Sequence, residues 1–83
     1  MNLQIYAVFD KKTEEYGTPM FLRTNGEAVR GFSDAVNAKE DNNNLSRHAE
    51  DYALYHIGAY NTQTAQITTN GTGRLVEATD VKA

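Results

Sequence analysis

One short stretch in the first half of the chain predicts a helix and thereby limits the folds open to this sequence. Thr24-Asn25-Gly26-Glu27 matches the capping-box pattern, in which an N-cap threonine is followed three residues later by glutamate. These two side chains can satisfy N–H groups that the first helical turn leaves without partners. Apolar residues then recur at helical spacing and build one stripe: Ala28, Val29, Phe32, Ala35 and Val36. The pattern predicts a helix over about residues 25–38.

The segments around this helix alternate with period two, as strands do. Residues 3–9 alternate between two faces, and residues 52–60 carry apolar side chains on both faces, which is typical of a central strand. Shorter extended pieces are expected at residues 20–23, after a proline, and at residues 65–69. These elements predict an α+β fold, in which one helix packs on a small, mainly antiparallel sheet of three or four strands.

The length of the chain, 83 residues, predicts a single domain near the lower limit of what folds unaided. Residues 39–46 have no periodicity and predict a solvated loop, and residues 73–83 predict a short extended piece, a loose helical turn or a loose tail. Because so small a core supplies little stability, we expect a homodimer, formed by sheet edges or by the face opposite the helix.

The composition excludes several classes of protein. The chain has no cysteine, which excludes a disulfide framework, a zinc–thiolate site and thiol catalysis. Its start, MNLQIYAVFD, has no basic leader, and no apolar run approaches membrane-spanning length, so we expect a soluble protein with no membrane partner. The net charge is −3, and the acidic excess lies in residues 25–52. Tight binding to nucleic acid needs a basic footprint, so only a weak, local contact with DNA is expected.

The stretch RHAEDYALYHIG (residues 47–58) gathers the residues most capable of proton transfer or metal binding. His48 and His56 are eight residues apart, which on a strand is too far for a shared metal ion. Glu50 and Asp51 are adjacent, so their side chains are expected to diverge from a single helical turn. We therefore assign no catalytic, metal or cofactor-binding residue and expect no enzyme activity.

Two further features of the sequence bear on a binding role. Residues 70–74, NGTGR, lack the glycine spacing and following helix of a phosphate-binding loop, so they are expected to be a linker. Aromatic and basic residues could contact a partner, and the candidates are Tyr6, Arg23, Arg30, Tyr55 and His56. If Tyr6, Tyr55 and one of the two arginines shared a face, they could bind single-stranded DNA, although the acidic excess argues against it.

The order of sequence blocks resembles the small nonstructural protein of gokushovirus-type microviruses, which are bacteriophages with single-stranded DNA. The blocks are IYAVFD, TPMFLRTNGEAVRGFSDAVN, LSRHAEDYALYHIGAYN and a closing RLVEATDVK, and together they cover almost the whole chain. One departure is Ala49, which stands where proline is common in that family.

The resemblance implies a non-enzymatic protein that acts in the cytoplasm of the infected host. Its expected role is to regulate genome replication, or the change to making and packaging single-stranded DNA, by binding a phage or host replication protein or DNA. The alternative is an assembly accessory, either scaffolding-like or a minor capsid-associated protein. No catalytic residue is implied by the resemblance.

Overall fold

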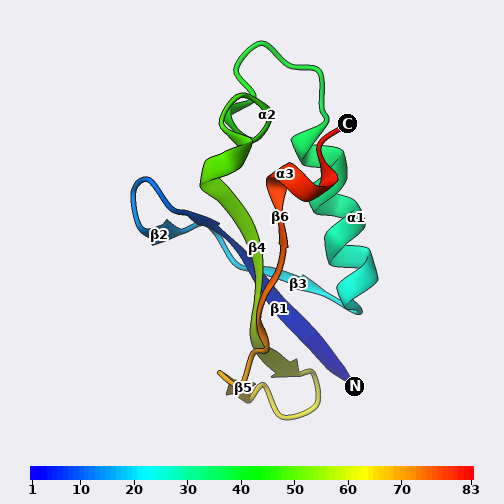
Figure 1. Ribbon diagram of the computed structural model, residues 1–83. Helices are drawn as coiled ribbons and strands as arrows, with labels where there is room; N and C mark the ends of the chain where they lie inside the picture. Colours follow the sequence, from blue (N-terminus) through cyan, green and yellow to red (C-terminus); the bar gives the residue numbers. More distant parts are fainter.

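A computed structural model describes residues 1–83, and it has the predicted α+β architecture, with an antiparallel sheet and one main helix (Figure 1). The strands are β1 (Asn2–Asp10), β2 (Glu15–Tyr16), β3 (Met20–Leu22), β4 (Tyr52–Asn61), β5 (Ile67–Thr68) and β6 (Gly73–Glu77). The helices are α1 (Asn25–Val36), α2 (Asn44–Arg47), the 3-10 turn η1 (Ala49–Asp51) and α3 (Ala78–Val81).

The sheet is built around two long antiparallel strands, β1 and β4, which pair along almost their whole lengths. Each outer strand is broken into two pieces: β2 and β3 both pair with β1, and β5 and β6 both pair with β4. All five pairings are antiparallel. The sheet therefore has six strands, more than the three or four predicted, and it is four strands wide because each outer strand is broken in two.

Helix α1 begins where the sequence predicts and ends two residues earlier. The Thr24 hydroxyl accepts a hydrogen bond from the N–H of Glu27 at 3.1 Å. The Glu27 carboxylate accepts from the N–H of Arg23 at 3.2 Å, one residue before the position that the capping box predicts. Ala35 is exposed, so the buried stripe of α1 is narrower than the sequence suggests.

The segment expected to be a solvated loop, residues 39–46, contains more structure than predicted. The Asn43 amide donates to the carbonyls of Ala35 and Ala38 at 2.9 and 2.8 Å, and so satisfies groups that the end of α1 leaves free. Helix α2 then starts at Asn44, inside the expected loop. The predicted turn before β4 forms as η1, and its Ala49 is buried without the proline common in the resembled family.

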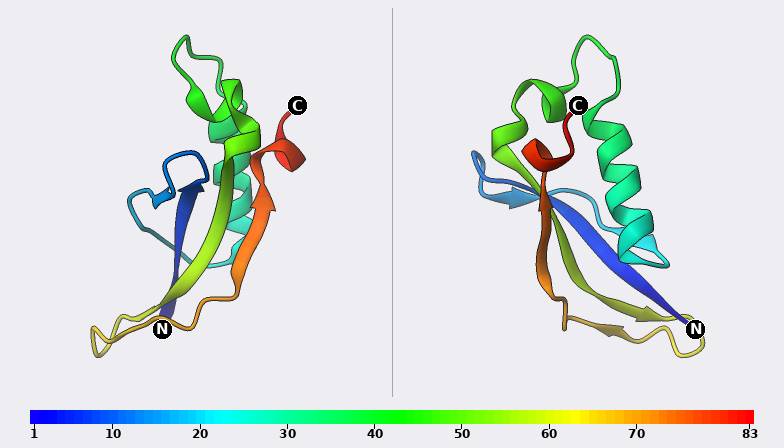
Figure 2. Two further views of the ribbon diagram at one scale, coloured as in Figure 1. Left: turned by 60° about the vertical axis from the view of Figure 1, so that its left-hand side comes forward. Right: turned by 45° about the vertical axis from the view of Figure 1, so that its right-hand side comes forward.

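The hydrophobic core lies between α1 and one face of the sheet. Ala28, Phe32 and Val36 of α1 are buried, and they share one cluster with Tyr6 of β1 and Leu54 of β4. Helix α1 lies to one side of the long strands, and the short helices gather near their upper end (Figure 2). None of them combines the length and the apolar character that crossing a bilayer requires.

The C-terminal segment forms both a strand and a helix. β6 pairs with β4, and Ala78 at the start of α3 is fully buried in the core cluster. The Asn37 amide donates to the carbonyl of Val81 at 2.9 Å, which ties α3 to the end of α1. Residues 73–81 are therefore an integrated part of the domain and not a loose tail.

The glycine-rich segment between β5 and β6 packs directly on the sheet, contrary to the linker prediction. A Cβ atom placed on Gly71 would lie 2.1 Å from the carbonyl oxygen of His56, so the two backbones are in close contact. The N–H of Thr72 donates to Nδ1 of His56 at 3.1 Å. This segment thus keeps the chain in contact with β4 between the end of β5 and the start of β6.

Candidate functional site

Two of the predicted interaction residues, Tyr6 and His56, lie in the interior beneath α1. Tyr6 is fully buried, its ring centroid is 5.3 Å from that of His56, and its hydroxyl donates to Oδ1 of Asn25 at 2.7 Å. Burial, with a contribution from the nearby Glu27 carboxylate, raises the pKa of Tyr6. Neither residue can meet a partner directly, so the expected interface role of His56 is not supported by its position.

The two ring nitrogens of His56 are both used within the fold. Nδ1 accepts from the backbone N–H of Thr72, which leaves Nε2 as the donor to Oε1 of Gln4 at 2.8 Å. His56 therefore links β1, β4 and the segment before β6.

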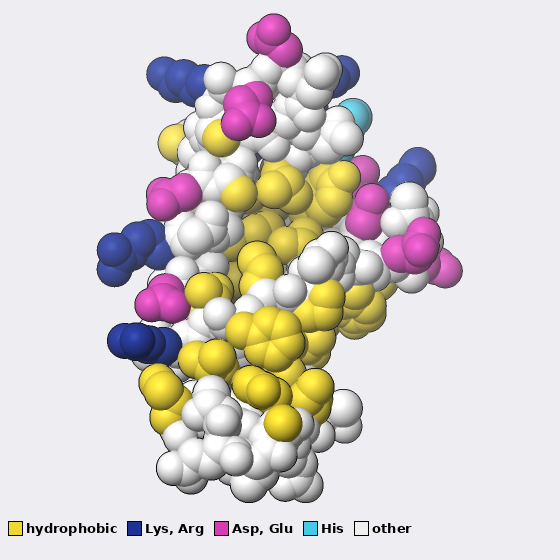
Figure 3. Space-filling model, turned by 180° about the vertical axis from the view of Figure 1, so that it is seen from behind, with side chains coloured by type: hydrophobic (Ala, Val, Ile, Leu, Met, Phe, Trp, Pro, Cys, Tyr) yellow, Lys and Arg dark blue, Asp and Glu magenta, His cyan; other side chains and the backbone are white.

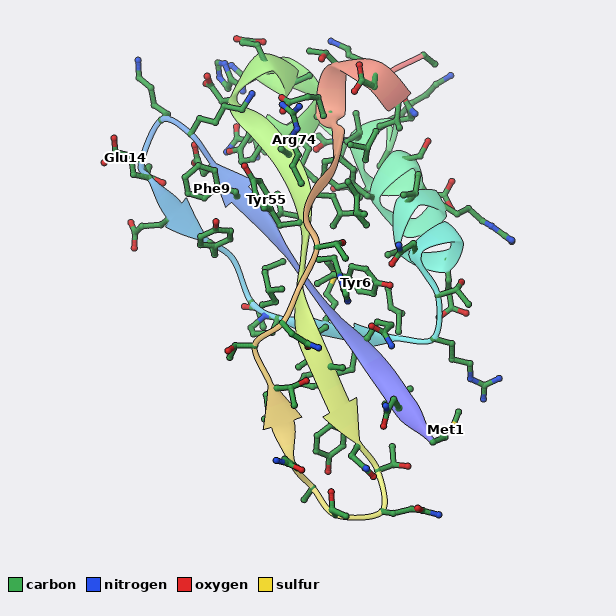
Figure 4. All side chains as sticks on the ribbon, turned by 60° about the horizontal axis from the view of Figure 1, so that its bottom comes forward. Met1, Tyr6, Phe9, Glu14, Tyr55 and Arg74 are labelled. Carbon is green, nitrogen blue, oxygen red and sulfur yellow. The ribbon has the colours of Figure 1, made fainter.

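The other three predicted interaction residues lie on different parts of the surface. Arg23 and Arg30 are exposed, just before α1 and on it. Tyr55 lies on the face of the sheet opposite Tyr6, as Figure 4 shows for the two labelled side chains. The single-strand binding face that would unite Tyr6, Tyr55 and an arginine does not exist in this fold.

Tyr55 instead belongs to an aromatic group on the face of the sheet that α1 leaves uncovered. The ring centroid of Phe9 is 4.6 Å from that of Tyr16 and 5.7 Å from that of Tyr55. Tyr16 and Tyr55 meet edge to face at 5.6 Å. Such edge-on contacts are a favourable geometry for aromatic rings.

A bulge in β4 brings a second aromatic pair to the same face. Ile5 pairs with Gly58 and Tyr6 pairs with His56, so Ile57 has no partner on β1. The extra residue reverses the alternation of β4, which therefore turns Tyr60 toward the same face as Tyr55. The rings of Tyr60 and Phe21 meet at 5.8 Å.

These side chains form one surface, which we call the aromatic face: Phe9, Tyr16, Phe21, Tyr55 and Tyr60. Tyr16 and Phe21 are 54% and 46% exposed. Ile5 and Ala7, on the same side of β1, are nearly fully buried without belonging to the core cluster under α1. Seen from behind, the molecule carries a band of hydrophobic side chains with charged groups at its margins (Figure 3). An apolar patch of this kind typically marks an interaction site.

A charged cluster lies where β6 ends. Glu77 pairs with Nζ of Lys11 and, at 2.8 Å, with the guanidinium of Arg74. The hydrogen bond from Lys11 is the main reason that the pKa of Glu77 lies below its ordinary value; partial burial opposes this shift, and Arg74 adds to it. The cluster thus joins the end of β1 to the strand that leads into α3.

Replacing Glu77 by glutamine is expected to destabilise the protein at neutral pH and much less in acid. The carboxylate has a lower pKa in the folded protein than in the unfolded chain, so its stabilisation is present above pH 4.5 and is lost as the pH falls through the folded pKa. Urea denaturation at pH 7 should show that Glu77→Gln lowers the free energy of unfolding by about 1 kcal/mol. The difference should shrink at pH 3. Glu14→Gln, at an exposed turn residue, is the control. An equal loss at both pH values would contradict the assignment.

A second cluster of polar side chains converges beside η1, where the sequence predicts that Glu50 and Asp51 diverge. Ligand atoms of His48, Glu50 and Asp51 all lie within 4.8 Å of one another. They line an open cavity of about 500 Å³ that also includes Asp10. The Cβ atoms of adjacent residues diverge, but these side chains are long enough for their ends to lie close together. His48 and Glu50 are exposed, so water competes for the ligand atoms of these two residues.

The sequence as a whole matches one known family. The profile of the Phage ORF5 protein family aligns with residues 3–81. The chain belongs to the Phage ORF5 protein family. Neither a curated protein nor a solved structure matches it. In this ORF5 protein the matched region includes every residue of the aromatic face.

Sequence reasoning found only one of the five residues that form the aromatic face of this ORF5 protein. Tyr55 is among the candidates, whereas strict alternation over residues 52–60 puts Tyr60 on the side of His56, because the bulge at Ile57 is not visible in the sequence. The alternation over residues 3–9 correctly groups Phe9 with Ile5 and Ala7 on one face of β1. The signal that could have found the surface is the aromatic residue in each short outer piece, Tyr16 and Phe21.

Proposed function

We propose that this phage protein is a non-enzymatic regulator of genome replication, or of the change to single-stranded DNA synthesis and packaging, in the cytoplasm of the host. It acts by binding a phage or host replication protein in an assembly that buries the aromatic face. The observation that carries the proposal is this face, five clustered rings on the side of the sheet without a helix. Exposed aromatic side chains are enriched at protein–protein interfaces.

Local charge favours a protein over nucleic acid as the occupant of the aromatic face. Aromatic rings on a sheet can stack on bases, but affinity for DNA rests largely on cations that neutralise phosphates. The chain carries a net charge of −3. Lys11 and Arg74, the two cations at the end of β6, already pair with Glu77. A protein surface needs no such cations, so it fits the face better than a phosphate backbone does.

Affinity capture from infected cells tests the proposed partner. Met20 and Phe21 are neighbours on β3 but oppose Tyr6 and Ile5, so their side chains point to opposite faces of the sheet. Both are exposed, which makes Met20→Ser the matched control for Phe21→Ser. We expect the wild-type protein and Met20→Ser to retain a replication protein, and Phe21→Ser to retain about tenfold less.

Three other results would contradict the proposal. Capture of coat protein in assembling particles would favour the alternative, an assembly accessory. If Phe21→Ser captured as much replication protein as wild type, the aromatic face would not be part of the interaction. A gel shift with single-stranded DNA at about micromolar affinity that falls steeply with salt would make the protein a DNA-binding one.

A further inference from the structure

We infer that a second copy of this chain occupies the aromatic face in the free protein, packed face to face about a two-fold axis. The inference rests on the proposed function in one respect, that the aromatic face binds protein. It adds the identity of the occupant in the absence of the replication protein, which would replace the second copy on this face.

The first argument is that one chain alone is less compact than a monomer of its size. A folded monomer of 9.2 kDa exposes about 4,900 Å² of surface, whereas this chain exposes 5489 Å². Its radius of gyration is 13.1 Å, against about 11.8 Å for a compact domain of 83 residues. A standard interface covers about 800 Å² of each partner. A second copy on the aromatic face would bury an area of the same order as this excess.

The second argument is that the sheet edges are poorly suited to pairing with another copy. The outer pieces β2, β3 and β5 have two or three residues each, and β6 has five. Interrupted, short edge strands are a common way in which proteins prevent edge-to-edge association. Of the two dimers that the sequence left open, the structure therefore favours the one formed by the face opposite α1.

Sedimentation equilibrium on the purified protein tests the inference without any other phage component. We expect the wild-type chain to have twice its mass of 9.2 kDa at about 100 µM, with a dissociation constant of about 10 µM or lower. Phe21→Ser should raise this constant at least tenfold, and Met20→Ser should change it by less than about threefold. Both substitutions are at exposed positions, and circular dichroism melts will verify that each variant folds.

A monomeric wild-type protein at about 100 µM, or a folded Phe21→Ser that dimerises as well as wild type, would overturn the inference. Either result would leave the capture of a replication protein unaffected as a test of the proposed function. Conversely, a dimer that captures no replication protein would overturn only that function.

Discussion

Replacing Phe32 by alanine is expected to leave the protein largely unfolded at 25 °C. Phe32 is 4% exposed, and it lies between Ala28 and Val36 on the buried stripe of α1. Truncating a buried phenylalanine typically costs about 3–5 kcal/mol, because the removed ring leaves a cavity. A domain of this size holds only about 5 kcal/mol of net stability. The loss would therefore remove most of the stability that keeps this single helix on the sheet.

A thermal melt followed by circular dichroism measures this effect. Asp34→Ala is the matched control, because Asp34 is exposed on the same helix and alanine favours helix formation there. We expect the control to melt at or slightly above the wild-type temperature. A cooperative melt of Phe32→Ala near that temperature would show that α1 does not depend on this ring.

Replacing Gly71 by alanine should also destabilise the fold strongly, although the change adds one methyl group. The new Cβ would lie 2.1 Å from the carbonyl oxygen of His56 and 2.5 Å from two backbone atoms of Ile57. These are backbone atoms of the central strand, so they cannot yield as the end of a flexible side chain does. Forced overpacking costs about 1–3 kcal/mol, and we expect about 3 kcal/mol here. The segment before β6 would have to separate from β4, and Thr72 would lose its hydrogen bond to His56.

Gly31→Ala is expected to stabilise the same protein. A Cβ on Gly31 would meet nothing within 4 Å, and alanine is preferred to glycine inside a helix by about 1 kcal/mol. Urea denaturation of the two variants should therefore shift in opposite directions from wild type. A Gly71→Ala protein as stable as Gly31→Ala would mean that residues 70–72 do not pack on β4.

The elements that the sequence predicted well are those set by neighbours along the chain. Thr24 and Glu27 mark the start of α1, and the apolar spacing that follows includes Phe32 and Val36, which are buried. Period-two alternation likewise identified β1 and β4 as strands. Both patterns depend on residues a few positions apart, so they can be read without knowing the tertiary contacts.

The features that the sequence did not predict depend on contacts between distant residues. Asn43 satisfies carbonyls at the end of α1, and Gly71 contacts the backbone of His56, fifteen residues earlier. The interior position of Tyr6 follows from which face of β1 receives α1, and alternation alone cannot choose between two faces that are both apolar. The same ambiguity concealed the aromatic face, since its rings come from four separate strands.

The unpaired Ile57 has a consequence for comparing this chain with related sequences. Because one extra residue in β4 decides which way Tyr60 points, the length of the strand matters there as much as the type of residue. In a relative whose β4 lacks the bulge, the aromatic residue equivalent to Tyr60 would stand one position earlier, at the place of Ala59. An alignment that allows no single-residue gap inside this strand would therefore miss that aromatic residue, although the surface itself is unchanged.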